Sequence, residues 1–202
     1  AGRLAMAGGR GGANRIRLAR HGLEESAAEI NRVGAEISSH ASGPGTLVFA
    51  SMGPTGAMLA AGEVEPDAVR EAFGEQAQAL SEGGADAIVV ETMSDLEEAV
   101  IATKRAAATG LPVVACMSYG SGKGGDRTMM GVTPEQAAEA LSEAGASVIG
   151  ANCGQGAVQM LEVVARLKAA TNLPVWAKPN AGMPELVDGA AVYRQSPEQF
   201  AD

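Results

Sequence analysis

The chain contains few aromatic residues and few cysteines. Phe, Tyr and Trp make up 3% of its 202 residues, and its two cysteines are Cys116 and Cys153. A core with so few aromatic side chains has to be built from Ala, Val, Leu, Ile and Met. Together with 27 glycines, this composition favours repeated strand–loop–helix units over a β-sandwich. Two cysteines do not make a disulfide framework, so we expect a reducing compartment.

Long apolar runs and an excess of positive charge are also missing. No run approaches the ~18 apolar residues of a membrane-spanning helix, and the Gly-rich segment 1–12 has too short an apolar stretch for a signal peptide. The 15 Lys and Arg residues against 24 Asp and Glu give a formal charge of −9, which argues against nucleic acid or anionic lipid as a partner. We therefore expect a cytoplasmic protein that binds neither nucleic acid nor membrane.

Short β-rich runs alternate with amphipathic stretches of helical periodicity, as in a parallel α/β fold. The expected strands are 46–51, 87–91, 112–118, 147–152 and 174–178. The expected helices are 14–40, 66–82, 95–109, 134–144 and 157–170. The pattern Glu-x-Gly-Ala precedes both residue 87 and residue 148, which indicates that one βα unit is repeated.

Five such units are compatible with an open doubly wound sheet or with part of a barrel. An open sheet that binds a dinucleotide would carry Gly-x-Gly-x-x-Gly after its first strand, and none is present there. A complete (β/α)8 barrel needs about 250 residues and eight strands. Segment 1–11 contains no convincing strand and is expected to be disordered. We therefore predict a single domain over residues 1–202, an incomplete TIM barrel with about five of the eight strands.

Three polar or thiol side chains lie at the ends of expected strands, where parallel α/β folds place their chemistry. Glu91 ends the run 87–91 and could bind a substrate ammonium group or form a salt bridge within the protein. Cys153 follows Asn152 and could ligate a metal, attack an electrophile or fill space as a small apolar residue. Asn180 lies in a Pro/Gly-fixed loop and could orient a substrate or the loop itself.

Other candidate residues favour structural interpretations. Asp95, Glu97 and Glu98 are typical acids of a first helical turn, and Cys116 lies in the middle of an apolar run. His21 and His40 each lack a second ligand at metal spacing and are expected to be solvated; the loops 53–56 and 120–125 are Gly-rich and could cradle an anion.

Several segments together resemble the homocysteine S-methyltransferase family. They are VVETMSDLEEA (89–99), GANCGQG (150–156), KPNAGMP (178–184), GPTG (53–56) and GANRIRLARHGLE (12–24). The family includes the homocysteine-binding barrel of cobalamin-dependent methionine synthase and the enzymes that use betaine or S-methylmethionine. The resemblance implies a (β/α)8 barrel in which three cysteine thiolates hold zinc. Homocysteine joins the zinc as a thiolate, and its sulfur takes a methyl group to form methionine.

By position, the resemblance implies that Cys153 is one zinc ligand and that Glu91 binds the amino group of homocysteine, with Asn152 and Asn180 as further substrate-binding residues. The family's other two zinc ligands are an adjacent cysteine pair on the last strand, and the sequence up to Asp202 contains no such pair. The resemblance therefore implies a barrel shortened at both ends, carrying strands three to seven, with open edges that favour association.

Three functions stay open from the sequence. The first is zinc-dependent methyl transfer to homocysteine, with the 202-residue chain inactive alone because one thiolate is too few. The second is a non-catalytic barrel fragment or pseudoenzyme without a complete metal site. The third is an enzyme that acts on a phosphorylated substrate through Glu91 and the glycine loops, with Lys178 as the basic residue at a strand end. The methyl donor (betaine, S-methylmethionine, or a methylcorrinoid or methylfolate bound by other modules), homo-oligomers and further domains are also left open.

Overall fold

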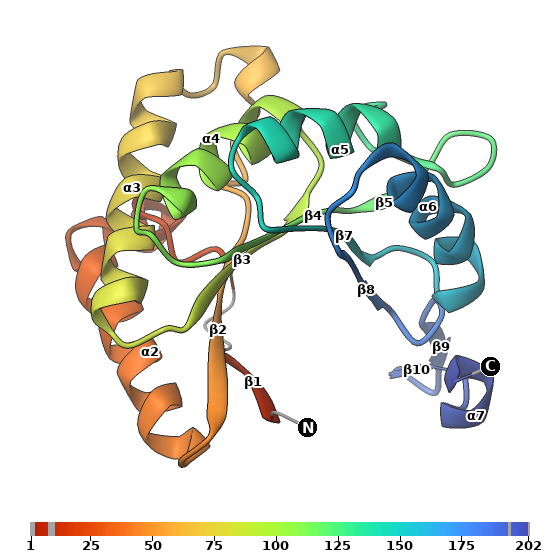
Figure 1. The fold of residues 1–202 in the computed structure, drawn as a ribbon, viewed down its shortest axis with the longest axis horizontal. Helices are drawn as coiled ribbons and strands as arrows, with labels where there is room; N and C mark the ends of the chain where they lie inside the picture. The colour runs from red at the N-terminus through yellow and green to blue at the C-terminus, as the bar shows by residue number, and fades with distance from the viewer. Residues whose placement is uncertain (1–2, 8–10, 194, 202) are drawn as a thin grey trace.

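A curved parallel sheet forms the centre of the computed structural model, which describes residues 3–7, 11–193 and 195–201 (Figure 1). The order of its six strands is β1-β2-β3-β4-β7-β8, so each strand pairs with its predecessor in this sheet, as in a barrel. The strands are β1 Arg3–Ala7, β2 Thr46–Met52, β3 Ala87–Met93, β4 Val113–Met117, β7 Val148–Cys153 and β8 Val175–Pro179. All five strands expected from the sequence are confirmed.

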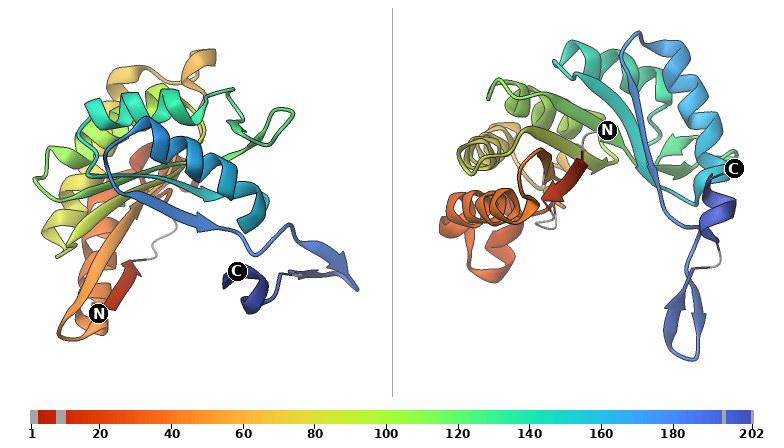
Figure 2. Two further views of the ribbon diagram at one scale, coloured as in Figure 1. Left: turned by 45° about the vertical axis from the view of Figure 1, so that its right-hand side comes forward. Right: turned by 60° about the horizontal axis from the view of Figure 1, so that its bottom comes forward.

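The longer helices cover the outer, convex side of this sheet (Figures 1 and 2). They are α2 Ala27–Ser42, α3 Pro66–Glu82, α4 Leu96–Ala107, α5 Pro134–Glu143 and α6 Ala157–Ala170. The predicted helix 14–40 is instead divided into α1 Arg15–Leu18, the 3-10 turns Ala19–His21 and Glu24–Ser26, and α2. The division lies at Gly22, whose φ of 67° is left-handed and ends the first helical segment.

Side chains cap the starts of two long helices, α4 and α5. Asp95 accepts hydrogen bonds from the N–H groups of Glu97 and Glu98 at 2.8 and 3.1 Å, so it caps α4. Thr133 and Gln136 form a capping box ahead of α5. These local contacts fix the starts of α4 and α5, and with them the loops that lead into these two helices.

Strand β1 is not predicted by the sequence. It pairs in parallel with β2, from Arg3 opposite Thr46 to Ala7 opposite Ala50. Its sequence RLAMA contains no β-branched or aromatic residue, so propensity gives no signal, and pairing with β2 decides its conformation. The expected disorder of segment 1–11 therefore does not hold for Arg3–Ala7, and residues 1, 2 and 8–10 lie outside the described part of the chain.

Two small hairpins and a short helix are further additions to the predicted elements. The hairpins pair β5 Tyr119–Ser121 with β6 Arg127–Thr128, and β9 Glu185–Val187 with β10 Ala190–Val192. Helix α7 spans Pro197–Ala201. The β9–β10 hairpin projects away from the sheet (Figure 2).

The two faces of the sheet differ in size and composition. The outer face packs against the helices through the large cluster of the core, which includes Val48, Ile88 and Ile149. The inner face carries a smaller cluster of Val89, Val114 and Cys116 with the partly buried Phe49, Val148 and Trp176. Phe49 of β2 stacks on Trp176 of β8 with ring centroids 6.0 Å apart, although three strands separate them in the sheet. The sheet is therefore curled into part of a barrel, as the incomplete-barrel prediction requires.

A glycine at the centre of the inner face permits this curl. A Cβ atom on Gly150 would lie 2.5 Å from the carbonyl oxygen of Trp176 and 2.6 Å from the sulfur of Cys116. Both distances are far below van der Waals contact, so a side chain at this position would push β8 and β4 away from β7.

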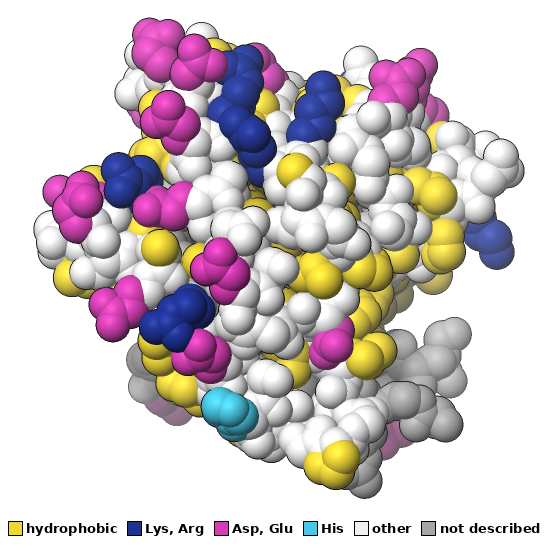
Figure 3. All heavy atoms as spheres, turned by 60° about the vertical axis from the view of Figure 1, so that its left-hand side comes forward, with side chains coloured by type: hydrophobic (Ala, Val, Ile, Leu, Met, Phe, Trp, Pro, Cys, Tyr) yellow, Lys and Arg dark blue, Asp and Glu magenta, His cyan; other side chains and the backbone are white. Residues whose placement is uncertain are grey.

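On the face that carries α2 and α3, acidic and basic side chains are interspersed (Figure 3). Arg15 pairs with Glu75 at 2.9 Å, and Arg32 pairs with Glu36 one helical turn further along α2. None of the helices within the described ranges is both long enough and apolar enough to cross a membrane.

Gly150→Ala is expected to lower the free energy of unfolding by roughly 1–3 kcal/mol, because the new methyl group overpacks the contact between three strands. Gly34→Ala is the matched control, since Gly34 lies within α2 and a Cβ there meets no atom within 4 Å. That control should raise the stability slightly, because Ala is the better helix former. Urea unfolding of both variants measures the difference, and equal stabilities would contradict the packing argument.

Candidate active site at the strand ends

The carboxyl ends of β3, β7 and β8 bring together the residues that the sequence singled out. Glu91 lies near the end of β3, Asn152 and Cys153 end β7, and Asn180 directly follows β8. Cys153 is opposite Pro179 in the register of β7 and β8, so Asn180 is one residue beyond it. The sequence prediction that these four residues share one edge of the sheet agrees with the structure.

A hydrogen-bonded network joins the ends of β3 and β7. The backbone N–H of Thr92 donates to Oδ1 of Asn152 at 2.8 Å. The Asn152 amide donates to Oγ1 of Thr92 at 2.8 Å and to Sγ of Cys153 at 3.1 Å. Because Asn152 is 1% exposed and both of its N–H donors are used, it contacts the thiol directly and holds it against Thr92.

The two residues joined by Asn152 both have strained backbones. Thr92 and Cys153 have φ values of 63° and 62°, in the left-handed region that residues with a Cβ rarely adopt. For Thr, which is β-branched, this conformation is a clear outlier. Such strain persists only where the surrounding structure imposes it, and it is frequent at functional sites. Here it turns the Thr92 and Cys153 side chains toward each other, with Oγ1 and Sγ 3.8 Å apart.

Glu91 is held by two partners on the inner face of the sheet. The Ser51 hydroxyl of β2 donates to its Oε1 at 2.6 Å, and the ammonium of Lys178 from β8 pairs with its Oε2. The Glu91 side chain is 16% exposed and the Lys178 side chain 42%, so the pair lies at the opening of the curled sheet. The structure contains the salt bridge that the sequence offered as one interpretation of Glu91, while binding of a substrate ammonium group by Glu91 stays a prediction.

Asn180 connects the ends of β7 and β8. Its backbone N–H donates to the carbonyl of Cys153 at 3.1 Å, and its side-chain amide donates to the carbonyl of Gly154 at 3.0 Å. The side chain thus orients the loop that follows Cys153, while a direct contact of Asn180 with a substrate stays a prediction.

The two thiols lie in different environments. Cys116 is buried on the inner face; burial, and to a lesser degree the Glu91 charge, raise the pKa of its thiol, as expected for a core residue. Cys153 is partly exposed at the strand end. Across the described ranges, no group of three His, Cys, Asp or Glu side chains is placed to hold a metal ion. Because a catalytic zinc normally has three protein ligands, the described residues do not complete such a site.

A cleft of about 520 Å³ opens beside Glu91 and Thr92. Its other wall comes from the segment that follows Gly11, including Arg17 and His21, and from Gly53 and Pro54 after β2. The two segments of this other wall meet where the N–H of Gly53 donates to the carbonyl of Gly11, and a Cβ on Gly11 would lie 2.8 Å from both Gly53 N and Ser51 Oγ.

The loop after β2 is held by a buried carboxylate. Oε1 of Glu98 accepts the N–H of Thr55 at 2.8 Å and its hydroxyl at 2.6 Å. Thr55 is fully buried and Glu98 is 4% exposed. A carboxyl oxygen therefore already accepts the Thr55 N–H, which removes that donor from an anion cradle at the loop 53–56. The helix-dipole interpretation of Glu98 is incomplete, since this residue fixes one wall of the cleft.

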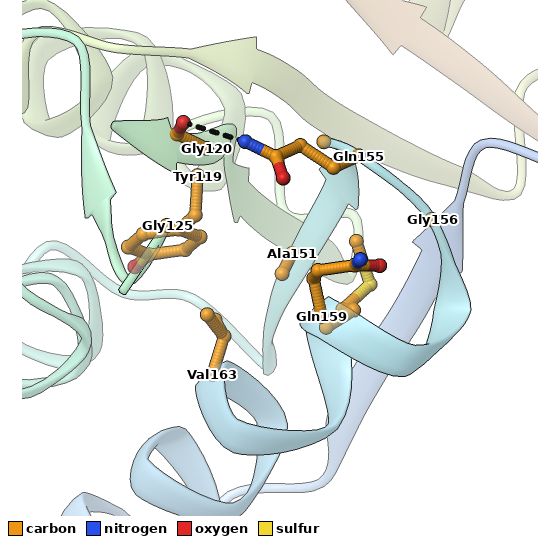
Figure 4. A pocket seen from close by; sticks show the side chains of 10 residues that line it. Tyr119, Gly120, Gly125, Ala151, Gln155, Gly156, Gln159 and Val163 are labelled. Atoms are coloured by element: carbon orange, nitrogen blue, oxygen red, sulfur yellow. Dashed lines mark hydrogen bonds between the residues drawn. The ribbon is translucent and has the colours of Figure 1, made fainter. Parts of the chain in front are cut away.

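A second pocket lies between β5, β7 and α6 and is too small for a substrate (Figure 4). Its volume is about 10 Å³, roughly that of one water-sized sphere. Tyr119 and Val163 line it, and Gln155 covers it by donating to the carbonyl of Gly120 at 3.1 Å. Burial raises the pKa of Tyr119, so its phenol stays neutral in this pocket.

Sequence reasoning missed Ser51 and Thr92. Ser51 had a detectable signal, because Leu47, Phe49 and Ser51 alternate on the inner face and the last of them is polar. Thr92 had none, since its role depends on a backbone conformation that the sequence does not encode locally.

Glu98→Gln tests the buried carboxylate. Burial raises the pKa of Glu98, which means that the folded state holds its proton more tightly than the unfolded state. The wild type should therefore lose stability relative to Glu98→Gln as the pH rises from the ordinary carboxyl range through the raised pKa. Gln keeps an oxygen acceptor for Thr55 without a charge. Urea unfolding between pH 4 and 8 measures the difference, and a difference that does not change with pH would contradict the assignment.

Comparisons with known proteins place this chain in a family. A model described as homocysteine S-methyltransferase matches residues 12–202. A methionine synthase of Mycobacterium tuberculosis is 34% identical over 161 residues, which cover 77% of this chain and 13% of that protein. Betaine–homocysteine S-methyltransferase 1 of Sus scrofa is 34% identical over 100 residues, 50% of this chain and 34% of that protein.

A solved structure supports the same fold. The metallated form of the homocysteine methyltransferase MmuM from Escherichia coli superposes with a TM-score of 0.73 at 21% identity, covering 89% of this chain and 67% of that one. The chain spans 13% of the length of the methionine synthases that it matches. The comparisons therefore show the family and the fold of this chain. Because the family match covers nearly the whole chain, the protein belongs to the homocysteine S-methyltransferase family.

Proposed function

We propose that this chain forms the homocysteine-binding part of an enzyme that transfers a methyl group to the sulfur of homocysteine and so produces methionine. The observation that carries the proposal is the juxtaposition of a carboxylate, Glu91, with a partly exposed thiol, Cys153, through Thr92 and Asn152. The family match supports the same reaction.

Each residue has a distinct part in this proposal. Glu91 accepts the ammonium of homocysteine, and Ser51 keeps that carboxylate oriented. Asn152 and Thr92 hold the Cys153 thiol at the end of β7, and Thr92 itself lines the cleft, so that the substrate sulfur would lie near this thiol. In the reaction the sulfur loses its proton and forms a bond to the methyl carbon, while the bond between that carbon and the donor breaks.

Zinc is part of the proposal, and Cys153 would supply one of its thiolate ligands. Further ligands would have to come from outside the described residues, for example from another segment or a second copy of the chain. The methyl donor is a separate question: betaine, S-methylmethionine, and a methylcorrinoid or methylfolate carried by other modules are all candidates. Because Cys153 supplies only one of the ligands that a catalytic zinc needs, we propose that the 202-residue chain by itself has no methyltransferase activity.

A non-catalytic partial barrel is the second candidate. The observation that favours it is the single thiol at the strand ends, together with a carboxylate that already has a cation partner in Lys178. Under this candidate the fold and the network around Asn152 are retained, while homocysteine does not bind.

Homocysteine binding separates the two candidates. We expect calorimetry to detect binding of L-homocysteine to the chain, and Glu91→Gln to weaken it about ten-fold, since a hydrogen bond to a charged group is lost. Glu97→Gln is the matched control, because Glu97 is an exposed acid on α4. Absence of homocysteine binding to the wild type would favour the non-catalytic barrel.

Zinc content and product formation test the proposals that the chain alone lacks a complete zinc site and has no methyltransferase activity. Elemental analysis should find clearly less than one zinc per chain, and mass spectrometry should find no methionine with any of the donors. One zinc per chain that is lost in Cys153→Ser would show that the site is completed by other ligands. Methionine formation by the chain alone would contradict the proposed inactivity.

A further inference from the structure

A further cleft lies outside the sheet, between the helices α3 and α4. Its volume is about 470 Å³. Its lining consists of Arg70 from α3 and, from α4, Glu97, Val100, Ile101, Lys104 and Arg105. Among the described residues, none lines both this cleft and the cleft beside Glu91. Because α2 packs against α3 and α5 packs against α4, the cleft lies within the helical layer and not at an open edge of the barrel (Figure 1).

The cleft is basic although the chain as a whole is acidic. Three cations and the acid Glu97 line it, whereas the whole chain has a formal charge of −9. Arg70 pairs with Asp67, but the Asp67 side chain is 88% exposed, so water screens this ion pair. The side chains of Lys104 and Arg105 form no hydrogen bond or ion pair with any described residue. The cleft therefore carries positive charge that the described protein groups do not neutralise.

Arg105 reaches from α4 to the surface of α3. A Cβ atom on Gly74 of α3 would lie 3.7 Å from Nε and 4.0 Å from Cζ of Arg105, so the guanidinium lies against α3 at this glycine. Gly74 is four residues beyond Arg70, and residues four apart share one face of a helix. Two guanidinium groups are thus placed on the same side of α3, where an anion bound to both would offset their repulsion.

The helix dipole explains only part of this arrangement. Lys104 and Arg105 lie in the last turn of α4, where the dipole favours cations. Arg70 lies in the N-terminal part of α3, where the dipole favours anions instead. The dipole therefore does not account for the three cations that line one cleft.

Apolar side chains complete the lining. Val100 is partly buried and packs against the core, and Ile101 is 7% exposed. Small-molecule sites typically combine such apolar surface with a few polar groups, in volumes of roughly 300–1,000 Å³. The volume of this cleft falls within that range. Its size and lining match a small molecule with an anionic group and an apolar portion.

We propose that the cleft between α3 and α4 binds a small organic anion that carries two or more negative charges and an apolar portion. Arg70 and Arg105 bind the anionic groups from the two helices, since guanidinium groups suit phosphate and carboxylate oxygens. Lys104 adds a third cation, and Val100 contacts the apolar portion. Phosphate esters and dicarboxylates share this chemistry. The site goes beyond the proposed function, because its residues lie outside the methyl-transfer site.

Calorimetry with the 202-residue chain at low ionic strength tests the site. The probes are phenyl phosphate and isophthalate, which distinguish a phosphate ester from a dicarboxylate, and inorganic phosphate, which lacks an apolar portion. We expect at least one of the two organic probes to bind more tightly than inorganic phosphate. In NMR spectra the amide signals of Gly74 and Val100 should shift on binding, while that of Gly12, beside the Glu91 cleft, should not.

Substitutions assign the binding to the cleft. Arg70→Met, Lys104→Met and Arg105→Met should each weaken binding of the tighter organic probe about five-fold, because one ion pair is lost. Glu97→Gln should strengthen binding, because an acid of the cleft loses its charge. Lys168→Met is the matched control, an exposed lysine of α6, and should leave the affinity unchanged. Thermal unfolding of each variant confirms that it is folded.

The outcomes separate a specific site from general attraction between charges. Weaker binding in the three cleft variants, with stronger binding in Glu97→Gln and no change in Lys168→Met, would support the proposal. Equal weakening by Lys168→Met would show non-specific attraction and overturn it, as would the absence of binding of both organic probes. Tighter binding of tetraglutamate than of either organic probe would point to an acidic protein segment and would also overturn it.

Discussion

The close contact of three strands at Gly150 is the constraint on which the rest of the structure depends. Because Gly150 has no side chain, the backbone of Trp176 and the sulfur of Cys116 occupy the space where a Cβ would lie. The sheet can then curl until β8 approaches β2 and β3, as the stacking of Phe49 on Trp176 shows. In a flatter sheet, side chains on these strands would point past one another, and the site would not form.

The strand ends add a second constraint, which is local strain held in place by hydrogen bonds. Thr92 and Cys153 both have left-handed backbones, and the buried amide of Asn152 contacts both residues. A buried amide with all its donors paired is rigid, and leaving one unpaired would be costly. The position of the Cys153 thiol is therefore set by the fold before any substrate or metal binds.

These two constraints set the positions of the charged groups and of the thiol in the site. The ion pair of Glu91 and Lys178 lies on the inner face of the sheet. The Cys153 thiol lies at the end of β7, 3.8 Å from Oγ1 of Thr92, the residue that follows Glu91. The chain that carries these groups belongs to the homocysteine S-methyltransferase family. The buried pair of Thr55 and Glu98 supports the same cleft from behind, by fixing the loop after β2.

The sequence by itself determined the five central strands, the helices α3, α4, α5 and α6, and the edge at which Glu91 and Cys153 lie, because hydrophobic periodicity is a local signal. It did not determine β1, whose residues have little strand propensity and depend on pairing with β2. Nor did it determine the contact between Glu91 and Lys178, which lie 87 residues apart. Only the tertiary structure decided that contact and the strained geometry at Thr92, because both depend on how far the sheet curls around Gly150.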